Sequence, residues 1–166
     1  QVYIYQTILM KGDKLIMYDI KKILVPVDGS PASIKASERA IEIAKKYGSE
    51  ITFLSVANTP DMFNIGDYSF RVHYNYDNVV NNHKLAQAEI LDKVIEGLDI
   101  EGVKFEKKVI SGEPAEEIIR MAHDCQYDYI VMGRRGFSKF TRFFVGSVTQ
   151  RVIAESPCAA VIVVNE

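Results

Sequence analysis

The sequence predicts an α/β protein in which one parallel β-sheet lies between two layers of helices. Short apolar runs typical of buried strands alternate with longer segments whose apolar residues recur at helical spacing. The resulting order is βαβαβαβαβ, and each connection is long enough to hold a helix. Neighbouring strands are therefore expected to run parallel, with helices on both faces of the sheet. The chain has 166 residues and is 48% hydrophobic, which suits one domain with a substantial core.

The first strand is expected at Ile23–Val27, a continuous apolar run that ends in the turn residues Asp-Gly-Ser-Pro. Pro26 has no N–H group, so it must lie near the end of this strand. Ser30 is then the expected N-cap of a helix whose first residue is Pro31. Apolar residues at helical spacing follow, and Gly48 suits the left-handed conformation that ends a helix.

The remaining elements follow from the same patterns. Further strands are expected at Ile51–Ala57, Val103–Ile110, Tyr129–Met132 and Ala159–Val164. Further helices are expected at Asn78–Gly97 and at Ser147–Glu155, and another helix is expected to begin at Gly112-Glu113-Pro114. Residues 58–77 show no clear period, which favours a long loop, with or without a helical turn. In an open sheet of this kind, ligands bind beyond the carboxyl ends of the strands, where the strand order reverses.

Residues 1–19 lie outside this alternation, and residues 20–166 form the expected single domain. Val2, Ile4 and residues 8–10 favour a strand or a hairpin, with a turn at 11–14. Two alternatives stay open for this N-terminal extension. It packs on the sheet edge or on a second subunit, because an isolated hairpin is marginally stable in water. Otherwise, it is an upstream extension before Met17 that only neighbouring molecules hold in place.

The composition argues against several classes of function. The formal net charge of −2 gives no reason to expect nucleic acid, and no apolar run reaches the length of about 18 residues that spans a membrane. Cys125 and Cys158 are the two cysteines and lack CxxC spacing, so neither a zinc site nor a redox motif is expected. They are expected to be small buried residues. Reduced thiols favour a cytoplasmic protein.

A basic, glycine-rich stretch follows the fourth expected strand. No acidic residue occurs from Tyr129 to Ala154, and the same span holds the five cations Arg134, Arg135, Lys139, Arg142 and Arg151. Gly133, Gly136 and Gly146 allow close backbone approach to a ligand. Ser147 and Thr149 add hydroxyl groups at a helix N-terminus, where anions bind. The stretch is expected to bind a polyphosphate; the alternative is a solvated basic loop with glycines for its turns.

The spacing of these glycines is G-x2-G-x9-G-S, and neither a P-loop nor a GxGxxG fingerprint is present. This spacing resembles the nucleotide-binding motif of the universal stress protein family, in its ATP-binding branch. The segments KKILVPVDGSPAS, VISGEPAEEII and SPCAAVIVV add to the resemblance, which covers residues 20–166. It implies a three-layer, Rossmann-like α/β sandwich with a five-stranded parallel sheet in the order 3-2-1-4-5.

The resemblance further implies an ATP site with Mg²⁺ carried by the nucleotide, and a homodimer joined through Ala159–Val164. The implied nucleotide-binding residues are Pro26, Val27, Asp28, Val56, Met132, Gly133, Arg134, Arg135, Gly136, Phe137, Ser138, Lys139, Gly146, Ser147, Val148 and Thr149. Asp28 is the acid among them. It accepts a hydrogen bond from a ribose hydroxyl or holds a metal-bound water, or else it caps the following helix.

Three functions remain open at this stage. The first is a nucleotide-dependent regulator or sensor in the stress response, the second a slow ATPase or self-phosphorylating enzyme, and the third a dimeric assembly module without ligand. Hydrolysis needs a positioned water and a base. His73, His83 and His123 do not fall at the carboxyl end of any expected strand, so no catalytic residue is assigned. The glycine spacing favours the binding protein.

Overall fold

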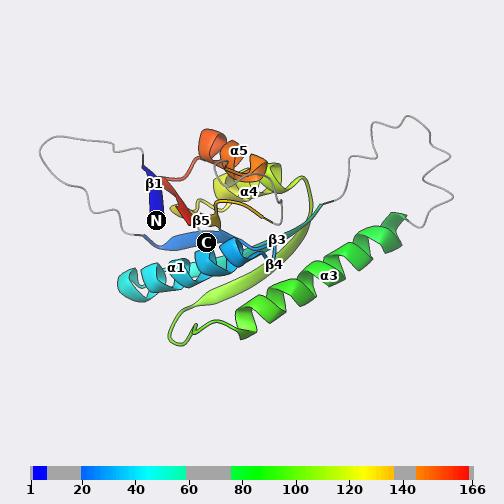
Figure 1. Cartoon of the computed structure of the whole chain (residues 1–166), viewed down its shortest axis with the longest axis horizontal. Helices are drawn as coiled ribbons and strands as arrows, with labels where there is room; N and C mark the ends of the chain where they lie inside the picture. The colour runs from blue at the N-terminus through cyan, green and yellow to red at the C-terminus, as the bar shows by residue number, and fades with distance from the viewer. Residues whose placement is uncertain (1, 7–19, 59–75, 137–144, 165–166) are drawn as a thin grey trace, which may run out of the picture.

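The structure is a computed structural model that describes residues 2–6, 20–58, 76–136 and 145–164 (Figure 1). Its strands are β1 (Val2–Gln6), β2 (Lys22–Pro26), β3 (Glu50–Asn58), β4 (Phe105–Gly112), β5 (Tyr129–Gly133) and β6 (Ala160–Val164). Its helices are α1 (Pro31–Tyr47), α3 (Tyr76–Glu96), α4 (Pro114–Asp124) and α5 (Ser147–Glu155). The elements expected from residue 20 onward are therefore confirmed, with boundaries that differ by a few residues.

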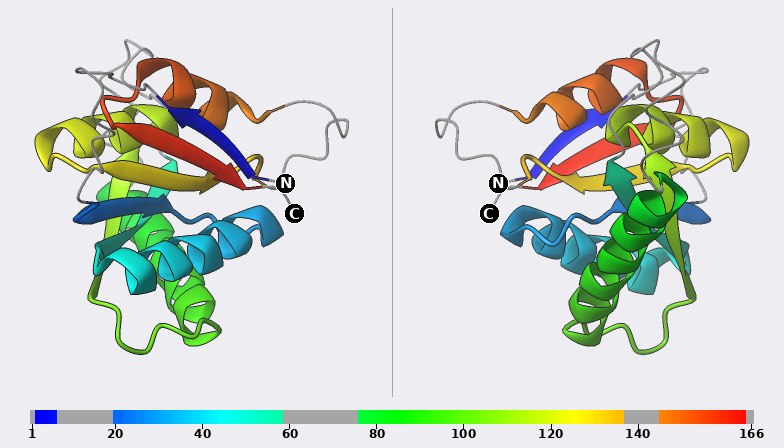
Figure 2. Two further views of the ribbon diagram at one scale, coloured as in Figure 1. Left: turned by 90° about the vertical axis from the view of Figure 1, so that its left-hand side faces the viewer. Right: turned by 90° about the vertical axis from the view of Figure 1, so that its right-hand side faces the viewer.

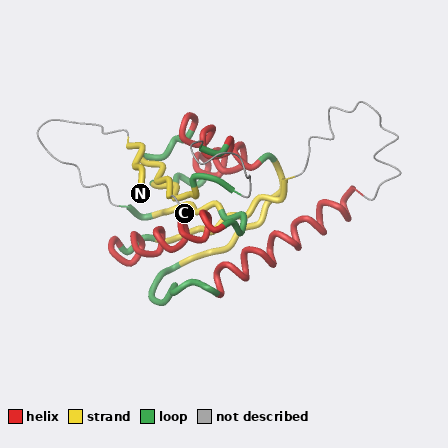
Figure 3. The backbone as a smooth tube through the Cα atoms, viewed as in Figure 1, coloured by secondary structure: helices red, strands yellow, loops and turns green. Residues whose placement is uncertain are grey.

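The strands form one sheet in the order β1-β6-β5-β2-β3-β4, which Figure 3 shows between the helices. The pairs from β6 to β4 are all parallel, and they reproduce the expected five-stranded order. The chain moves outward from β2 to β3 and β4, and then returns to place β5 on the other side of β2. The order thus reverses between β2 and β5, and a ligand site is expected beyond the ends of these two strands.

The helices cover the two faces in pairs, as the side views in Figure 2 show. On one face α1 and α3 pack over a cluster that includes Ile23, Val25, Phe53 and Leu91. On the other face α4 and α5 pack over a second cluster, which includes Ile118, Ile130 and Val152. The central strands are buried on both faces, which is why they are continuous apolar runs in the sequence.

The ends of α1 follow the expected chemistry. Ser30 is its N-cap, and its side-chain oxygen accepts a hydrogen bond from the N–H of Ser33 at 3.2 Å. Gly48 ends the helix in the left-handed conformation, with φ of 73°, where a side chain would be strained. Helix α3 begins at Tyr76, inside the segment expected to be a loop. Residues 59–75 of that segment lie outside the described residues.

The outer edge of β6 is covered by part of the N-terminal extension, which agrees with the alternative that places this extension on the sheet edge. β1 pairs antiparallel with β6 over its whole length, from Val2 opposite Val164 to Gln6 opposite Ala160. The strands lie side by side in Figure 2. The sheet therefore has a sixth, antiparallel strand. The turn expected at 11–14 lies outside the described residues.

None of the described helices combines the length and the apolar character needed to cross a bilayer.

Candidate functional site

A pocket opens where the strand order reverses. It is lined by Pro26, Val27, Asp28, Ser33, Leu54, Val56, Pro114, Ile118, Met132, Gly133, Arg135, Gly136, Val148 and Thr149. Its empty space, including the solvent at its mouth, is about 650 Å³. The ends of β2, β3 and β5 and the first turns of α1, α4 and α5 all contribute to it.

The walls of the pocket are mainly apolar, with polar groups gathered near β5 and the start of α5. Val27 and Met132 are almost fully buried at the ends of two adjacent strands, and Ile118 adds a side chain from α4. The polar side chains that line the pocket include those of Asp28 and Arg135. Such a surface suits a ligand with one flat apolar part and one anionic part.

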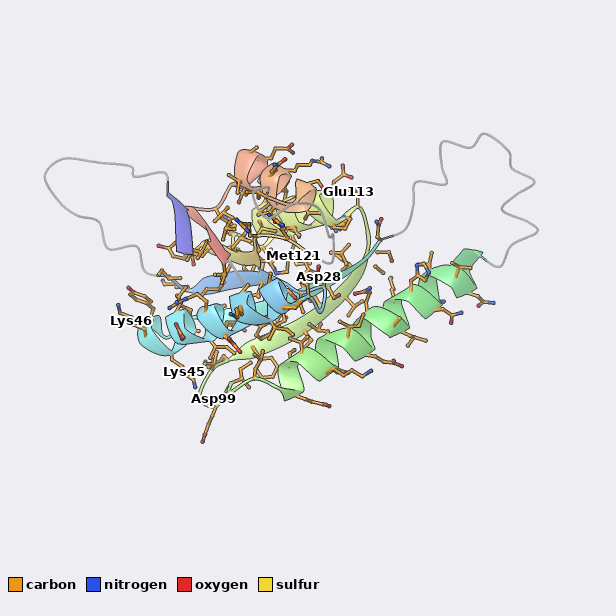
Figure 4. The ribbon with its side chains drawn as sticks, in the orientation of Figure 1. Asp28, Lys45, Lys46, Asp99, Glu113 and Met121 are labelled. Atoms are coloured by element: carbon orange, nitrogen blue, oxygen red, sulfur yellow. The ribbon has the colours of Figure 1, made fainter. Side chains whose placement is uncertain are left out.

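Asp28 is exposed and faces both the α1 turn and the glycine-rich loop. Its Oδ1 accepts a hydrogen bond from the N–H of Ser30 at 2.9 Å, so the carboxylate stabilises the turn that leads into α1. Its Oδ2 lies where a Cβ atom on Gly136 would collide with it. The lack of a side chain at Gly136 therefore leaves room for this carboxylate. In Figure 4, Asp28 lies at the same end of the sheet as Glu113, the N-cap of α4.

Gly133 has a packing role that the sequence did not show. A Cβ atom at this position would lie 2.8 Å from both the carbonyl carbon and the Cβ of Ala32, in the first turn of α1. The glycine therefore lets α1 pack closely against the end of β5. The sequence analysis explained this glycine only by close approach of a ligand. The packing of α1 already requires a glycine at this position.

Three hydrogen bonds fix the two ends of the glycine-rich loop, of which residues 137–144 lie outside the described residues. The N–H of Gly146 donates to the carbonyl of Arg134, and the N–H of Arg134 donates to the carbonyl of Val164, both at 2.9 Å. The hydroxyl of Thr149 donates to the carbonyl of Gly133 at 3.0 Å. Since Thr149 is buried and its proton is used in this bond, it positions the loop rather than donating to a phosphate.

The N-terminus of α5 differs from those of α1 and α4. Side chains cap α1 and α4, through Ser30 and Glu113, whereas Gly146 provides no side-chain cap for α5. The first intrahelical bond runs from the N–H of Gln150 to the carbonyl of Gly146. The N–H groups of residues 147–149 precede this bond and lie at the positive end of the helix dipole. Ser147 is also exposed. This helix start is suited to an anion.

The described cations play different roles. Arg135 lines the pocket, whereas Arg134 does not. Arg151 pairs with Glu113 at 2.9 Å and with Glu155 at 3.3 Å, so it joins α5 to the start of α4. Arg151 was counted among the cations of the acid-free span but not among the predicted site residues, and these ion pairs occupy its guanidinium. Arg142 and the predicted site residues Phe137, Ser138 and Lys139 lie outside the described residues.

Ten of the predicted site residues line this one pocket: Pro26, Val27, Asp28, Val56, Met132, Gly133, Arg135, Gly136, Val148 and Thr149. Arg134, Gly146 and Ser147 do not line it, but they belong to the loop ends and the helix start beside it. The sequence analysis missed Ser33, Leu54, Pro114 and Ile118. Pro114 was detectable, since it follows a strand whose carboxyl end was expected to border a ligand.

Among the described residues, the side chains with displaced pKa values lie outside this pocket. They are Asp99, Glu106, Lys108, Arg120, Tyr127 and Cys158. Within the described ranges, no group of three or more histidines, cysteines or acids is arranged to hold a metal ion.

Comparison with known proteins identifies the family. The model of the universal stress protein family matches residues 19–164. Universal stress protein MJ0531 of Methanocaldococcus jannaschii is 31% identical over 161 residues, which cover 97% of this chain and 89% of the relative.

Solved structures agree with this match. The structure of the hypothetical protein MJ0577 is 25% identical, with a TM-score of 0.65, and the similarity covers 90% of this chain and 98% of that one. Two more distant structures share the fold, each with a TM-score of 0.56. One is a universal stress protein family protein from Arabidopsis thaliana with AMP bound, 19% identical over 88% of this chain and 92% of its own. The other is a universal stress protein in complex with cAMP, 18% identical over 89% and 98%. The chain belongs to the universal stress protein family.

Proposed function

We propose that this protein binds an adenine nucleotide, with ATP as the preferred ligand, and acts as a nucleotide-dependent regulator in the stress response. One observation carries the proposal. Apolar strand ends and an uncapped helix N-terminus meet in one pocket at the point where the strand order reverses. The distant relatives solved with AMP and with cAMP support the choice of an adenine nucleotide.

Each part of the ligand has a matching surface. The apolar walls, with Val27 and Met132, would hold the base. Asp28 would accept a hydrogen bond from a ribose hydroxyl through Oδ2, because its Oδ1 already bonds Ser30. The N–H groups of the first turn of α5 would donate to phosphate oxygens, and Arg135 would add a charge-assisted contact.

Magnesium would enter with the nucleotide. Mg²⁺ usually keeps several waters and binds phosphates together with one or two carboxylates. Asp28 is the carboxylate among the described lining residues, so it would contact the ion directly or through a water. The ion would neutralise phosphate charge in this site.

The regulatory role is favoured over rapid hydrolysis by the residues around the pocket. Hydrolysis needs a residue that positions water. Among the described lining residues Asp28 is the single acid, and half of its carboxylate already stabilises a turn. Slow ATP turnover is the alternative, and measurement of ADP formation by the purified protein distinguishes the two.

The test is isothermal titration of nucleotide-free protein with Mg·ATP and with AMP. ATP is expected to bind more tightly than AMP, because the α5 N-terminus and Arg135 contact the additional phosphates. Arg135→Ala should weaken ATP binding about 10- to 100-fold, the loss expected when a charge-assisted hydrogen bond is removed. Arg134→Ala is the matched control and should change affinity less than threefold, a small effect on this scale.

Two outcomes would contradict the proposal. If neither ATP nor AMP binds, the protein does not bind an adenine nucleotide. Equal affinity for ATP and AMP, with no effect of Arg135→Ala, would show that the base and ribose supply most of the binding affinity. The basic residues would then be solvated surface residues that do not contact phosphate.

The cytoplasmic location and the homodimer stay predictions. A dimer joined through Ala159–Val164 also needs β1 to leave β6, because both edges of that strand are paired.

A further inference from the structure

A groove lies at the amino ends of β5 and β6, at the opposite end of these strands from the pocket described above. It runs between the last turn of α4 and the residues that lead into β6, and its lining includes Asp124, Asp128, Pro157 and Ala159. Its empty space, including the solvent at its mouth, is about 1170 Å³, compared with about 650 Å³ for the pocket at the other end. The groove is therefore wide enough for a segment of chain.

We propose that residues 7–19 of the same chain occupy this groove. In this arrangement Lys11 or Lys14 contacts the carboxylate of Asp124 or Asp128, and apolar residues on either side of the two lysines pack along the groove. Residues 7–18 precede the part of the chain that the family model matches. The proposal is independent of the nucleotide site.

Both ends of the segment are fixed beside the groove. β1 is antiparallel to β6 and ends opposite Ala160, so the chain leaves β1 in the direction of Ala159. It returns at Lys21 and Lys22, whose N–H groups each donate to Oδ2 of Asp128 at 2.9 Å. The N–H of Ala159 donates to the carbonyl of Asp128 at 3.0 Å, so the two anchor points are neighbours. Figure 1 shows the end of β1 and the start of β2 on the same side of the sheet.

The length of the segment keeps it near the groove. Fully extended, residues 7–19 reach at most about 45 Å, and both of their ends are held at the groove. A short tether of this kind gives an effective concentration of about 1 mM. An affinity for the groove of only about 0.1 mM would then dock the segment in about nine of ten molecules. The second anchor does not depend on β1, so the segment would reach the groove whether or not β1 stays on β6.

The apolar content of the segment favours docking over exposure to water. Apolar residues flank the Lys11-Gly12-Asp13-Lys14 sequence on both sides, and they are Ile8, Leu9, Met10, Leu15, Ile16 and Met17. In the groove, Pro157 is exposed and Ala159 is half-buried, so both offer apolar surface to a neighbour. Contact between these two sets of side chains removes apolar surface from water, which is favourable.

The charges of the groove determine which part of the segment lies where. Among the described lining residues, Asp124 and Asp128 are the acids, and neither lysine nor arginine occurs. Asp124 is exposed, and its carboxylate also contacts His123 at 3.1 Å. Of the acids of the segment, Asp13 lies between the two lysines and Asp19 lies next to the anchored end. Because exposed ion pairs are weak, the lysine contact sets the position of the segment, and the apolar contacts supply most of the affinity.

The first test links lysines to the carboxylates that they contact in the natural protein. A water-soluble carbodiimide activates a carboxylate, and the lysine amine then displaces the activating group as a urea, which leaves an amide bond. Mass spectrometry of the digested protein should show a lysine of the segment linked to Asp124 or Asp128. The pair Lys45 and Asp99, whose charged atoms lie 2.8 Å apart, is the positive control. In a mixture of isotope-labelled and unlabelled protein, the link should join residues of one chain.

The second test weakens docking by reversing one charge. Trypsin cleaves after Lys11 and Lys14, and the rate of cleavage follows the undocked population. Cleavage there should be about tenfold slower in the natural protein than in a free peptide of residues 7–19. Asp124→Lys should accelerate it about threefold, because a repulsion replaces an exposed attraction. Glu155→Lys is the matched control and should have no effect, because it reverses an exposed acid at the last residue of α5, outside the groove.

Several results would overturn the proposal. A link between differently labelled chains would place the segment in the groove of a second copy. Links from its lysines only to other acids, or no link while the Lys45–Asp99 amide forms, would place the segment elsewhere. Cleavage as fast as in the free peptide, or at equal rates in the two folded variants, would show that the groove does not hold it. If a variant fails to fold by circular dichroism, the linking test decides, because it needs no substitution.

Discussion

Replacing Gly133 with alanine tests whether this glycine is needed for packing alone. The new Cβ would lie 2.8 Å from the carbonyl carbon and the Cβ of Ala32, closer than real Cβ contacts allow. Ala32 is buried in the first turn of α1, so relief requires the helix to shift relative to β5. Overpacking of this kind costs about 1–3 kcal/mol. For a domain of this size, a loss of 2 kcal/mol lowers the melting temperature by about 4–8 °C.

Gly146→Ala is the matched control because it makes the same chemical change at the other end of the loop. There the new Cβ has its nearest neighbours at 3.4 Å from the carbonyl oxygen of Arg134 and 3.5 Å from the Cα of Arg135. These contacts require only a small adjustment, so the free energy of unfolding should fall by no more than about 1 kcal/mol, the preference for glycine over alanine at an N-cap. A loss of ATP affinity in this stable variant would come from the ligand site.

Urea unfolding followed by circular dichroism measures both variants, since the chain has no tryptophan for fluorescence. Adding Ala32→Gly to Gly133→Ala should restore part of the lost stability, because it removes one of the two close carbons and leaves the backbone carbonyl. A Gly133→Ala protein as stable as the natural chain would refute the packing role. Equal losses in the two variants would refute the distinction between the glycines.

Three further changes test the surroundings of the site. Arg151→Ala should leave ATP affinity unchanged in titration calorimetry and lower stability by at most about 1 kcal/mol, because it removes exposed ion pairs. A clear loss of affinity would contradict this and place Arg151 in the nucleotide site. Tyr127→Phe removes a buried hydroxyl that donates to Thr52 at 2.7 Å, so urea unfolding should show a loss of about 1 kcal/mol, and an unchanged midpoint would contradict this. A hydrogen bond from Lys108 lowers the pKa of Glu106 below its ordinary value of 4.5. The stability gained from that ionised carboxylate is present above pH 4.5 and is lost as the pH falls through the lowered pKa. Glu106→Gln should therefore make the free energy of unfolding less sensitive to acid between about pH 6 and pH 3. Parallel pH profiles for the variant and the natural chain would contradict the prediction.

The elements that local chemistry determines could be predicted from the sequence. The buried strands, the Ser30 cap and the left-handed Gly48 depend on neighbouring residues, and each was found as expected. The position of the pocket also followed, because the carboxyl ends of parallel strands meet at one edge of the sheet.

Features that join distant parts of the chain could not be predicted in this way. Gly133 appeared to serve a ligand, because nothing in its vicinity along the chain shows that Ala32 packs against it. Arg151 is one of five cations in a span without acids, and its ion pair with Glu113, 38 residues away, depends on how the fold brings α5 to the start of α4. The pairing of β1 with β6 joins opposite ends of the chain. Such contacts depend on the geometry of the assembled sheet.

The bonded ends of the glycine-rich loop have a practical consequence for protein engineering. Arg134 and Gly146 are joined by a backbone hydrogen bond, and Arg134 is bonded in turn to Val164 of β6. Once the ends of a loop are held together, doubling its length costs only about 0.6 kcal/mol in chain entropy. A reporter peptide or a circularly permuted fluorescent protein inserted between residues 140 and 144, beyond the predicted site residues Phe137, Ser138 and Lys139, would therefore leave the sheet intact. Placed beside the proposed phosphate site, such an insertion would turn the protein into a fluorescent sensor whose signal reports nucleotide occupancy.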